Sequence, residues 1–274
     1  MTEASELPTP PPAAHPLATA LARPKLIAVG CVIALAALGW LYLAFAVADM
    51  GAPGATLGPG MTIFDNLPRA VQAICRPLFG ETMPEHGVWL IALMWGAMTL
   101  AMMLPTAGPM ILTYAEIADT AARKGERIVS PLVLAAGYTL AWLGFAAAAT
   151  IAQYAFTRAA LLDHGMASAS GLFSGAIFIG AGVYQFSALK HACLKQCQSP
   201  FPFFFANWAT TPRGVFRLGV KQGLYCLGCC WAMMTVIFAV GVMNIVWMAA
   251  LGVVMTLEKI GTGKRFTYIV GMAL

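Results

Sequence analysis

The sequence predicts an all-α fold, a polytopic transmembrane helical bundle of about six spans with a possible partial seventh. Three observations support this fold class. The 274-residue chain is 60% hydrophobic and only 10% charged, whereas soluble domains average roughly 45–50% and 25%. Its apolar residues fall into runs long enough to cross a bilayer, and its basic residues gather in alternate connecting segments. An aqueous globule could not bury this much apolar surface.

The chain divides into a tail and one membrane domain. Residues 1–25 are polar and proline-rich, and no small-residue cleavage site follows a short apolar core, so they are expected to form a flexible cytoplasmic tail and not a signal peptide. Residues 26–274 are expected to form a single transmembrane helical domain, because six spans leave no room for a second folded domain. The lipid bilayer is therefore a predicted partner. The net charge of +5 is small and does not indicate binding to nucleic acid.

Six apolar runs are the expected spans. They cover residues 26–48, 88–112, 132–156, 171–189, 222–241 and 244–257. The last run, 266–274, is too short to cross a bilayer and gives the partial seventh. Pro105 and Pro109 are expected to kink or end the second run. Asn244 is expected to cap the helix of the sixth.

The basic residues predict the orientation of the chain. If the N-terminus is cytoplasmic, 13 of the 16 Lys and Arg residues lie on the inner side, and only Arg69, Arg76 and Arg158 lie on the outer side. Cytoplasmic loops are rich in Lys and Arg. Lys190 and Lys259 are counted among the inner segments beside the spans. The apolar runs themselves contain no Asp, Glu, Lys, Arg or His, so carboxylate-based proton coupling is not expected.

Two groups of cysteines are expected on the cytoplasmic side. The first holds Cys226, Cys229 and Cys230, and the second holds Cys193 and Cys197. Residues spaced by three or four share one face of a helix, so each group points its sulfur atoms one way. If the fourth and fifth runs are neighbours, two thiols from each could converge on one metal ion. His191 could replace one thiolate, but it would need a bent turn to reach the others.

The residue types indicate a soft metal. Thiolate and imidazole ligands suit Cu(I), Zn or an iron–sulfur cluster, and a disulfide framework is disfavoured in the cytoplasm. The second run adds Met94, Met98 and Met102 at four-residue spacing, which are expected to face the bundle interior. A methionine stripe is usually core packing, yet thioethers select Cu(I) among biological metals. Cu(I) is therefore the favoured ion.

The cysteine-containing segments also carry a family resemblance. YQFSALKHACLKQCQSP and GLYCLGCCWAMM, with MWGAMTLAMMLP before them and GVMNIVWMAALGVVMTLEK after them, resemble a bacterial family of predicted metal-binding integral membrane proteins. The resemblance covers roughly residues 88–262, and its specificity lies in the Cys-x3-Cys and Cys-x2-Cys-Cys-Trp patterns. It implies metal binding and a multi-pass protein of the bacterial cytoplasmic (inner) membrane. It does not imply a reaction.

Three functions are compatible with these features. The favoured one is soft-metal handling, in which the methionines accept Cu(I) and the cysteines hold it, for transport or for delivery to a metallochaperone or metalloenzyme. The second is a membrane thiol–disulfide protein that exchanges with a quinone. The third is a structural assembly subunit whose cysteines only pack. The sequence shows no catalytic residues, so binding is favoured over enzymatic catalysis, and it leaves the oligomeric state open.

Overall fold

The computed structural model describes residues 24–50, 87–125, 128–162, 170–242, 244–261 and 263–274. Every regular element within these ranges is an α-helix, in agreement with the predicted class. Of the predicted tail, only Pro24 and Lys25 are described, and they begin the first helix. In chain order the helices are α2 (Pro24–Met50), α4 (Gly87–Thr106), α5 (Gly108–Arg123), α6 (Pro131–Arg158), α7 (Gly171–Gln185), α8 (Ala188–Gln198), α9 (Pro200–Ala206), α10 (Pro212–Thr235), α11 (Ile237–Val240), α12 (Ile245–Ile260) and α13 (Lys264–Ala273).

Four of the described helical segments are long and apolar enough to cross a membrane. They are Leu26–Ala44, Val88–Thr106, Pro131–Arg158 and Pro212–Val240. A fifth results if α7 and α8 form one span that is bent by 64°. The 16 residues of α12 extend about 24 Å, less than the roughly 30 Å hydrocarbon core of a bilayer. The sixth span and the cytoplasmic N-terminus stay predictions.

Prolines and cap residues set the ends of several helices. α4 contains Pro105 and ends at Thr106, and Pro109 stands in the first turn of α5. The predicted run 88–112 is therefore two helices, because proline interrupts the helical hydrogen bonds. The expected cap of α12 is confirmed, since the side-chain oxygen of Asn244 accepts a hydrogen bond from the backbone N–H of Trp247 at 3.2 Å.

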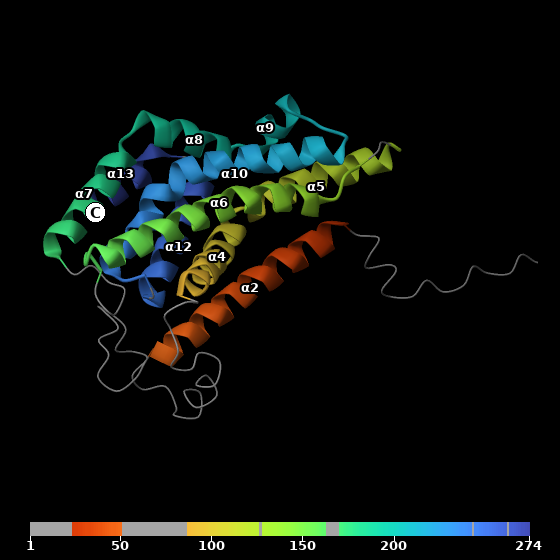
Figure 1. Ribbon diagram of the computed structural model, residues 1–274. Helices are drawn as coiled ribbons and strands as arrows, with labels where there is room; N and C mark the ends of the chain where they lie inside the picture. The colour runs from red at the N-terminus through yellow and green to blue at the C-terminus, as the bar shows by residue number, and fades with distance from the viewer. Residues whose placement is uncertain (1–23, 51–86, 126–127, 163–169, 243, 262) are drawn as a thin grey trace, which may run out of the picture.

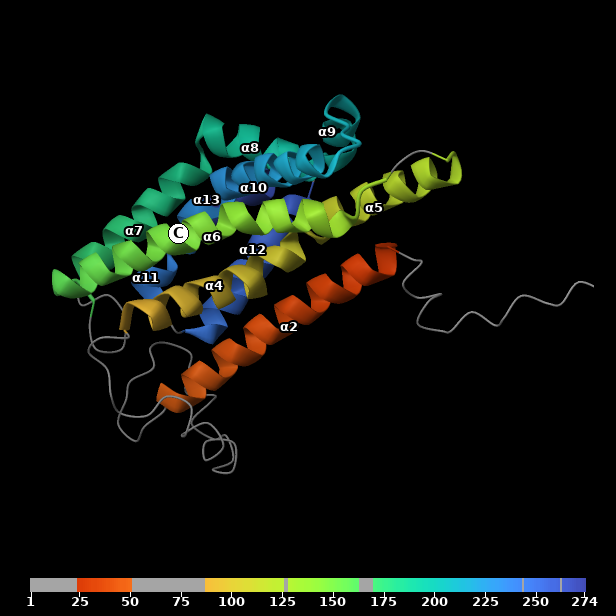
Figure 2. The ribbon, with the colours of Figure 1, turned by 45° about the vertical axis from the view of Figure 1, so that its right-hand side comes forward.

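The helices pack around α6 and α10, which lie side by side (Figures 1 and 2). α4 packs between α2 and α6, and α12 packs on α4. α7 and α8 contact α10, and α13 contacts α7. The bend between α7 and α8 keeps α8 beside α10. α6, α7, α8 and α12 therefore all contact α10, the helix that carries Cys226, Cys229 and Cys230.

Glycines make the contact between α6 and α10. Gly219 and Gly223 on α10 are four residues apart; Gly219 faces Gly137 of α6, and Gly223 faces Tyr138 and Ala141 of the same helix. A Cβ atom at Gly219 would overlap the carbonyl of Leu134, and one at Gly137 would overlap the carbonyl of Phe216. Small residues at this spacing allow helix backbones to approach closely, as in the GxxxG contacts of membrane helices. The two helices are thus held at backbone contact.

We expect Gly219→Ala to destabilise the protein, because its methyl group overlaps backbone that has no room to move. Overpacking of this kind costs about 1–3 kcal/mol. Gly144→Ala on α6 is the matched control, since no atom lies within 4 Å of its new Cβ. Thermal unfolding in detergent should show a lower Tm for Gly219→Ala and no loss for Gly144→Ala. Equal Tm values would contradict the close contact.

Candidate metal centre

Three thiols of α10 form one buried group. Cys226, Cys229 and Cys230 are each 1–2% exposed, and their sulfur atoms all lie within 4.8 Å of one another. The Sγ atoms of Cys229 and Cys230 are 3.4 Å apart, and the Cys229 thiol donates to the carbonyl of Cys226 at 3.1 Å. Among the described residues, these three are the group identified as able to hold a metal ion. The helical spacing noted in the sequence explains their grouping.

Cys197 brings a fourth sulfur to this group from α8. Its Sγ is 4.0 Å from that of Cys229. Two sulfurs bound to one Zn ion at about 2.3 Å are at most about 4.6 Å apart, so this distance is compatible with a shared ion. Cys197 and Cys226 also line the same cavity of about 20 Å³. The two cysteine groups therefore meet, as the sequence predicts for neighbouring fourth and fifth runs.

Cys193 lies one helical turn before Cys197 and contacts a different part of α10. Its sulfur rests against the backbone of Gly228, where an added Cβ would be only 2.6 Å away. The carbonyl of Gly228 accepts a hydrogen bond from the hydroxyl of Tyr184. Glycine at position 228 leaves the space that this thiol fills. A ligand role for Cys193 stays a prediction.

His191 is not brought to the three thiols of α10. Its ring packs edge-on against Tyr268 of α13, with ring centres 5.3 Å apart. It also lines a cavity of about 510 Å³ together with Lys195 and Lys264. α8 continues as a regular helix through this position, so the bent turn that His191 would need is missing. The structure therefore does not support His191 as a replacement for one of the thiolates.

A lysine and a tyrosine contact the thiol group, and no sequence pattern indicated either one as part of the site. The ammonium of Lys259 donates to the Cys226 sulfur at 3.0 Å and also to the hydroxyl of Thr106. The hydroxyl of Tyr138 lies 2.9 Å from the Cys226 sulfur and donates to the carbonyl of Met103 at 3.1 Å. Metals bind the thiolate form of cysteine. Lys259 therefore supplies positive charge where a metal–thiolate group would carry negative charge.

A second buried lysine pairs with a carboxylate. Lys190 of α8 forms a 2.8 Å ion pair with Glu258 of α12, the residue before Lys259. Lys190 and Lys259, which the sequence places in inner segments beside the spans, are buried in the bundle, at 0% and 8% exposure. After the bend, α8 contacts α12, and Gln198 donates to the carbonyls of Glu258 and Gly261. Counting charges along the sequence could not reveal that α8 turns back toward α12.

The methionines predicted from the second run are buried. Met94, Met98 and Met102 are 5%, 0% and 2% exposed, as expected for side chains that face the bundle interior. Met102 reaches α12, where its Cε lies 3.9 Å from the position of a Cβ at Gly252. The stripe on α4 is therefore buried, and Met102 within it meets α12. A ligand role for these methionines stays a prediction.

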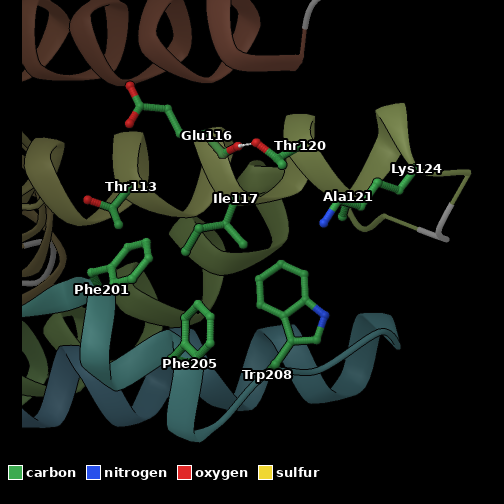
Figure 3. Close-up of a pocket in the computed structure, with 9 residues that line it drawn as sticks. All are labelled: Thr113, Glu116, Ile117, Thr120, Ala121, Lys124, Phe201, Phe205 and Trp208. Atoms are coloured by element: carbon green, nitrogen blue, oxygen red, sulfur yellow. Dashed lines mark hydrogen bonds between the residues drawn. The ribbon is translucent and has the colours of Figure 1, made fainter.

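A separate cavity of about 520 Å³ lies between α5 and α9 (Figure 3). Phe201 and Phe205 from α9, and Trp208 from the segment after it, point toward Ile117 of α5. No cysteine, histidine or methionine lines this cavity. It lies apart from the thiol group and adds no soft-metal ligand to it.

The fold and the site together define a class of protein. A bundle whose described elements are all helices, and inside which several sulfur atoms converge, is suited to binding a soft metal ion. The family model described as PpoB2: Copper chaperone matches residues 92–274. The chain belongs to this copper chaperone family, and the match includes both cysteine groups and the methionines of α4. This confirms the expectation of a metal-binding family. No curated protein and no solved structure matches the chain.

The burial of the thiols predicts their order of reaction with a bulky maleimide. In the folded, metal-free protein, the half-buried Cys193 should be labelled before the buried Cys226, Cys229 and Cys230, which should react much more slowly. Mass spectrometry of digested samples would measure this order, with unfolded protein as the control in which all seven cysteines react. Labelling of Cys226 as fast as Cys193 would contradict the described burial.

Proposed function

We propose that this protein is an integral membrane Cu(I) chaperone. It holds one Cu(I) ion at Cys226, Cys229 and Cys230 together with Cys197, for transport or for delivery to a metallochaperone or metalloenzyme. The observation that carries the proposal is the convergence of these sulfurs, with the three α10 thiols within 4.8 Å of one another and Cys197 4.0 Å from Cys229. Once deprotonated, these thiols could bind a single metal ion without a large movement of the helices.

Copper is favoured over zinc by the family and by the surroundings of the site. The family description names copper, and buried thioethers, which select Cu(I), lie on the neighbouring α4. Thiolates bound to Cu(I) leave the site with net negative charge, and the ammonium of Lys259, 3.0 Å from the Cys226 sulfur, offsets part of it. A buried charge is costly unless it is compensated. Lys259 therefore partly compensates the negative charge of the proposed loaded site.

A membrane location is supported by the outer surface of the helices. Large apolar side chains point outward along the long helices, including Ile151 at 70%, Leu172 at 86% and Trp89 at 74% exposure. Extended apolar surface of this kind marks contact with lipid or another apolar partner. Together with the four membrane-length helices and the uneven distribution of basic residues, it supports the bacterial cytoplasmic membrane with the N-terminus inside.

Serine substitutions test the thiol site. Cys226→Ser and Cys197→Ser should each weaken Cu(I) binding by at least about tenfold, because even the loss of a group that only supports a metal ligand weakens binding 10–100-fold. Anaerobic titration against a Cu(I) chelator would measure the affinity. Cys31→Ser is the matched control, since Cys31 lies on α2 and the proposed ligands lie on α8 and α10. Wild-type affinity in both site variants would reduce these cysteines to packing residues.

The methionines of α4 are proposed as transient Cu(I) ligands. Replacing Met94, Met98 and Met102 together by Leu nearly conserves volume and hydrophobicity, so the fold should be retained. Cells that express the triple variant should accumulate or tolerate copper differently from cells with wild-type protein, because leucine offers no sulfur. Unchanged copper behaviour, with normal protein levels, would make the stripe ordinary core packing.

A further inference from the structure

Methionine is segregated to the interior of this protein in a way that other apolar residues are not. Of the ten methionine side chains that the structure describes, nine are buried, and only Met272 is exposed. Leucine and isoleucine, by contrast, also occur on the exposed surface, as Leu172 and Ile151 show. Lipid tails are as apolar as leucine, so hydrophobicity gives membrane helices no reason to turn one apolar residue inward and another outward. The inward thioethers call for a different explanation.

Two of these buried methionines lie on α12. Met248 and Met255 are both 0% exposed. With Gly252 and Lys259 they follow spacings of four, three and four residues, which places all four positions on one face of the helix. This face leads over about 16 Å, at 1.5 Å per residue, from Met248 to the lysine that contacts Cys226.

α4 carries a second face of the same kind. Met94, Met98, Met102 and Thr106 follow one another at four-residue spacing and are all buried. The face ends at Thr106, whose hydroxyl accepts a hydrogen bond from Lys259. It therefore ends at the same point as the face on α12.

Two contacts join the faces along their length. Met102 lies over Gly252, with its Cε 3.9 Å from where a Cβ would stand, and Thr106 contacts Lys259. Since both contacts advance along both helices in the same direction, α4 and α12 run parallel here, side by side in both views (Figures 1 and 2). Gly252 opens the gap that Met102 fills. The helix interface is thus lined by thioethers from both sides, up to the thiol group.

We propose that the α4–α12 interface is a thioether passage that loads the cysteine site, with Met248 and Met255 as the second row of transient ligands. This inference rests on the proposed Cu(I) function and deepens it by naming the route. The ion exchanges thioether ligands for thiolates without any transfer of electrons. Each thiol that binds releases its proton. With the N-terminus inside, the passage opens at the Gly87 end of α4, on the outer face.

Met248→Leu/Met255→Leu tests the route. In right-side-out membrane vesicles given Cu(I) from outside under anaerobic conditions, near-ultraviolet absorbance of Cu(I)–thiolate bonds follows loading. The double variant should load at least about tenfold more slowly than wild type, because leucine offers the ion no ligand along the path. The final amount of bound Cu(I) and the Tm should match wild type. Met272→Leu, on the exposed methionine, is the control and should load normally.

Other outcomes separate the passage from the proposed function. Loading of the double variant at the wild-type rate would overturn the passage and leave the thiol site standing. A lower final amount of Cu(I) would make the thioethers resident ligands and would also overturn a passage. Wild-type protein that binds Cu(I) in detergent but does not load from outside would also overturn the passage and leave the thiol site standing. Wild-type protein that binds no Cu(I) in detergent would contradict the proposed function itself.

If the double variant has a lowered Tm, the single Met255→Leu variant takes its place in the same comparison.

Discussion

The backbone contact between α6 and α10 is the constraint on which the rest of the site depends. Because Gly137, Gly219 and Gly223 carry no side chains, the two helices meet at their main chains. Tyr138, the residue after Gly137, is thereby held with its hydroxyl 2.9 Å from the sulfur of Cys226. The remaining sides of α10 are left for α7, α8 and α12. The buried thiol group, with contacts from several helices, therefore depends on one tight helix pair.

Local features of the site could be predicted from the sequence, and contacts between distant segments could not. The grouping of Cys226, Cys229 and Cys230 follows from helical spacing alone, and so does the shared face of the α4 methionines. Lys259 lies 33 residues from the cysteine that it contacts, and Tyr138 lies 88 residues away. No periodicity links such positions. The bend that turns α8 back also escaped prediction, and with it the burial of Lys190.

The buried charges of this protein lie next to one another along α12. Glu258 is neutralised by Lys190, whereas the adjacent Lys259 is directed at sulfur and hydroxyl groups. Consecutive residues on a helix point about 100° apart, so one helix end serves an ion pair with α8 and the thiol group of α10. The ion pair anchors α12 against α8, and this anchoring fixes the direction of Lys259.

The 64° bend between α7 and α8 gives the fourth sulfur a mechanical independence that the other three lack. Cys226, Cys229 and Cys230 share one helix and keep their spacing whatever the rest of the bundle does. Cys197 comes from a helix attached through Phe186 and Ser187, so its distance from Cys229 changes whenever α8 shifts. An ion held by all four sulfurs would staple α8 to α10, and amide hydrogens in α8 would then exchange more slowly with solvent. In the proposed site, occupancy by a metal ion would thus be coupled to the motion of a single short helix.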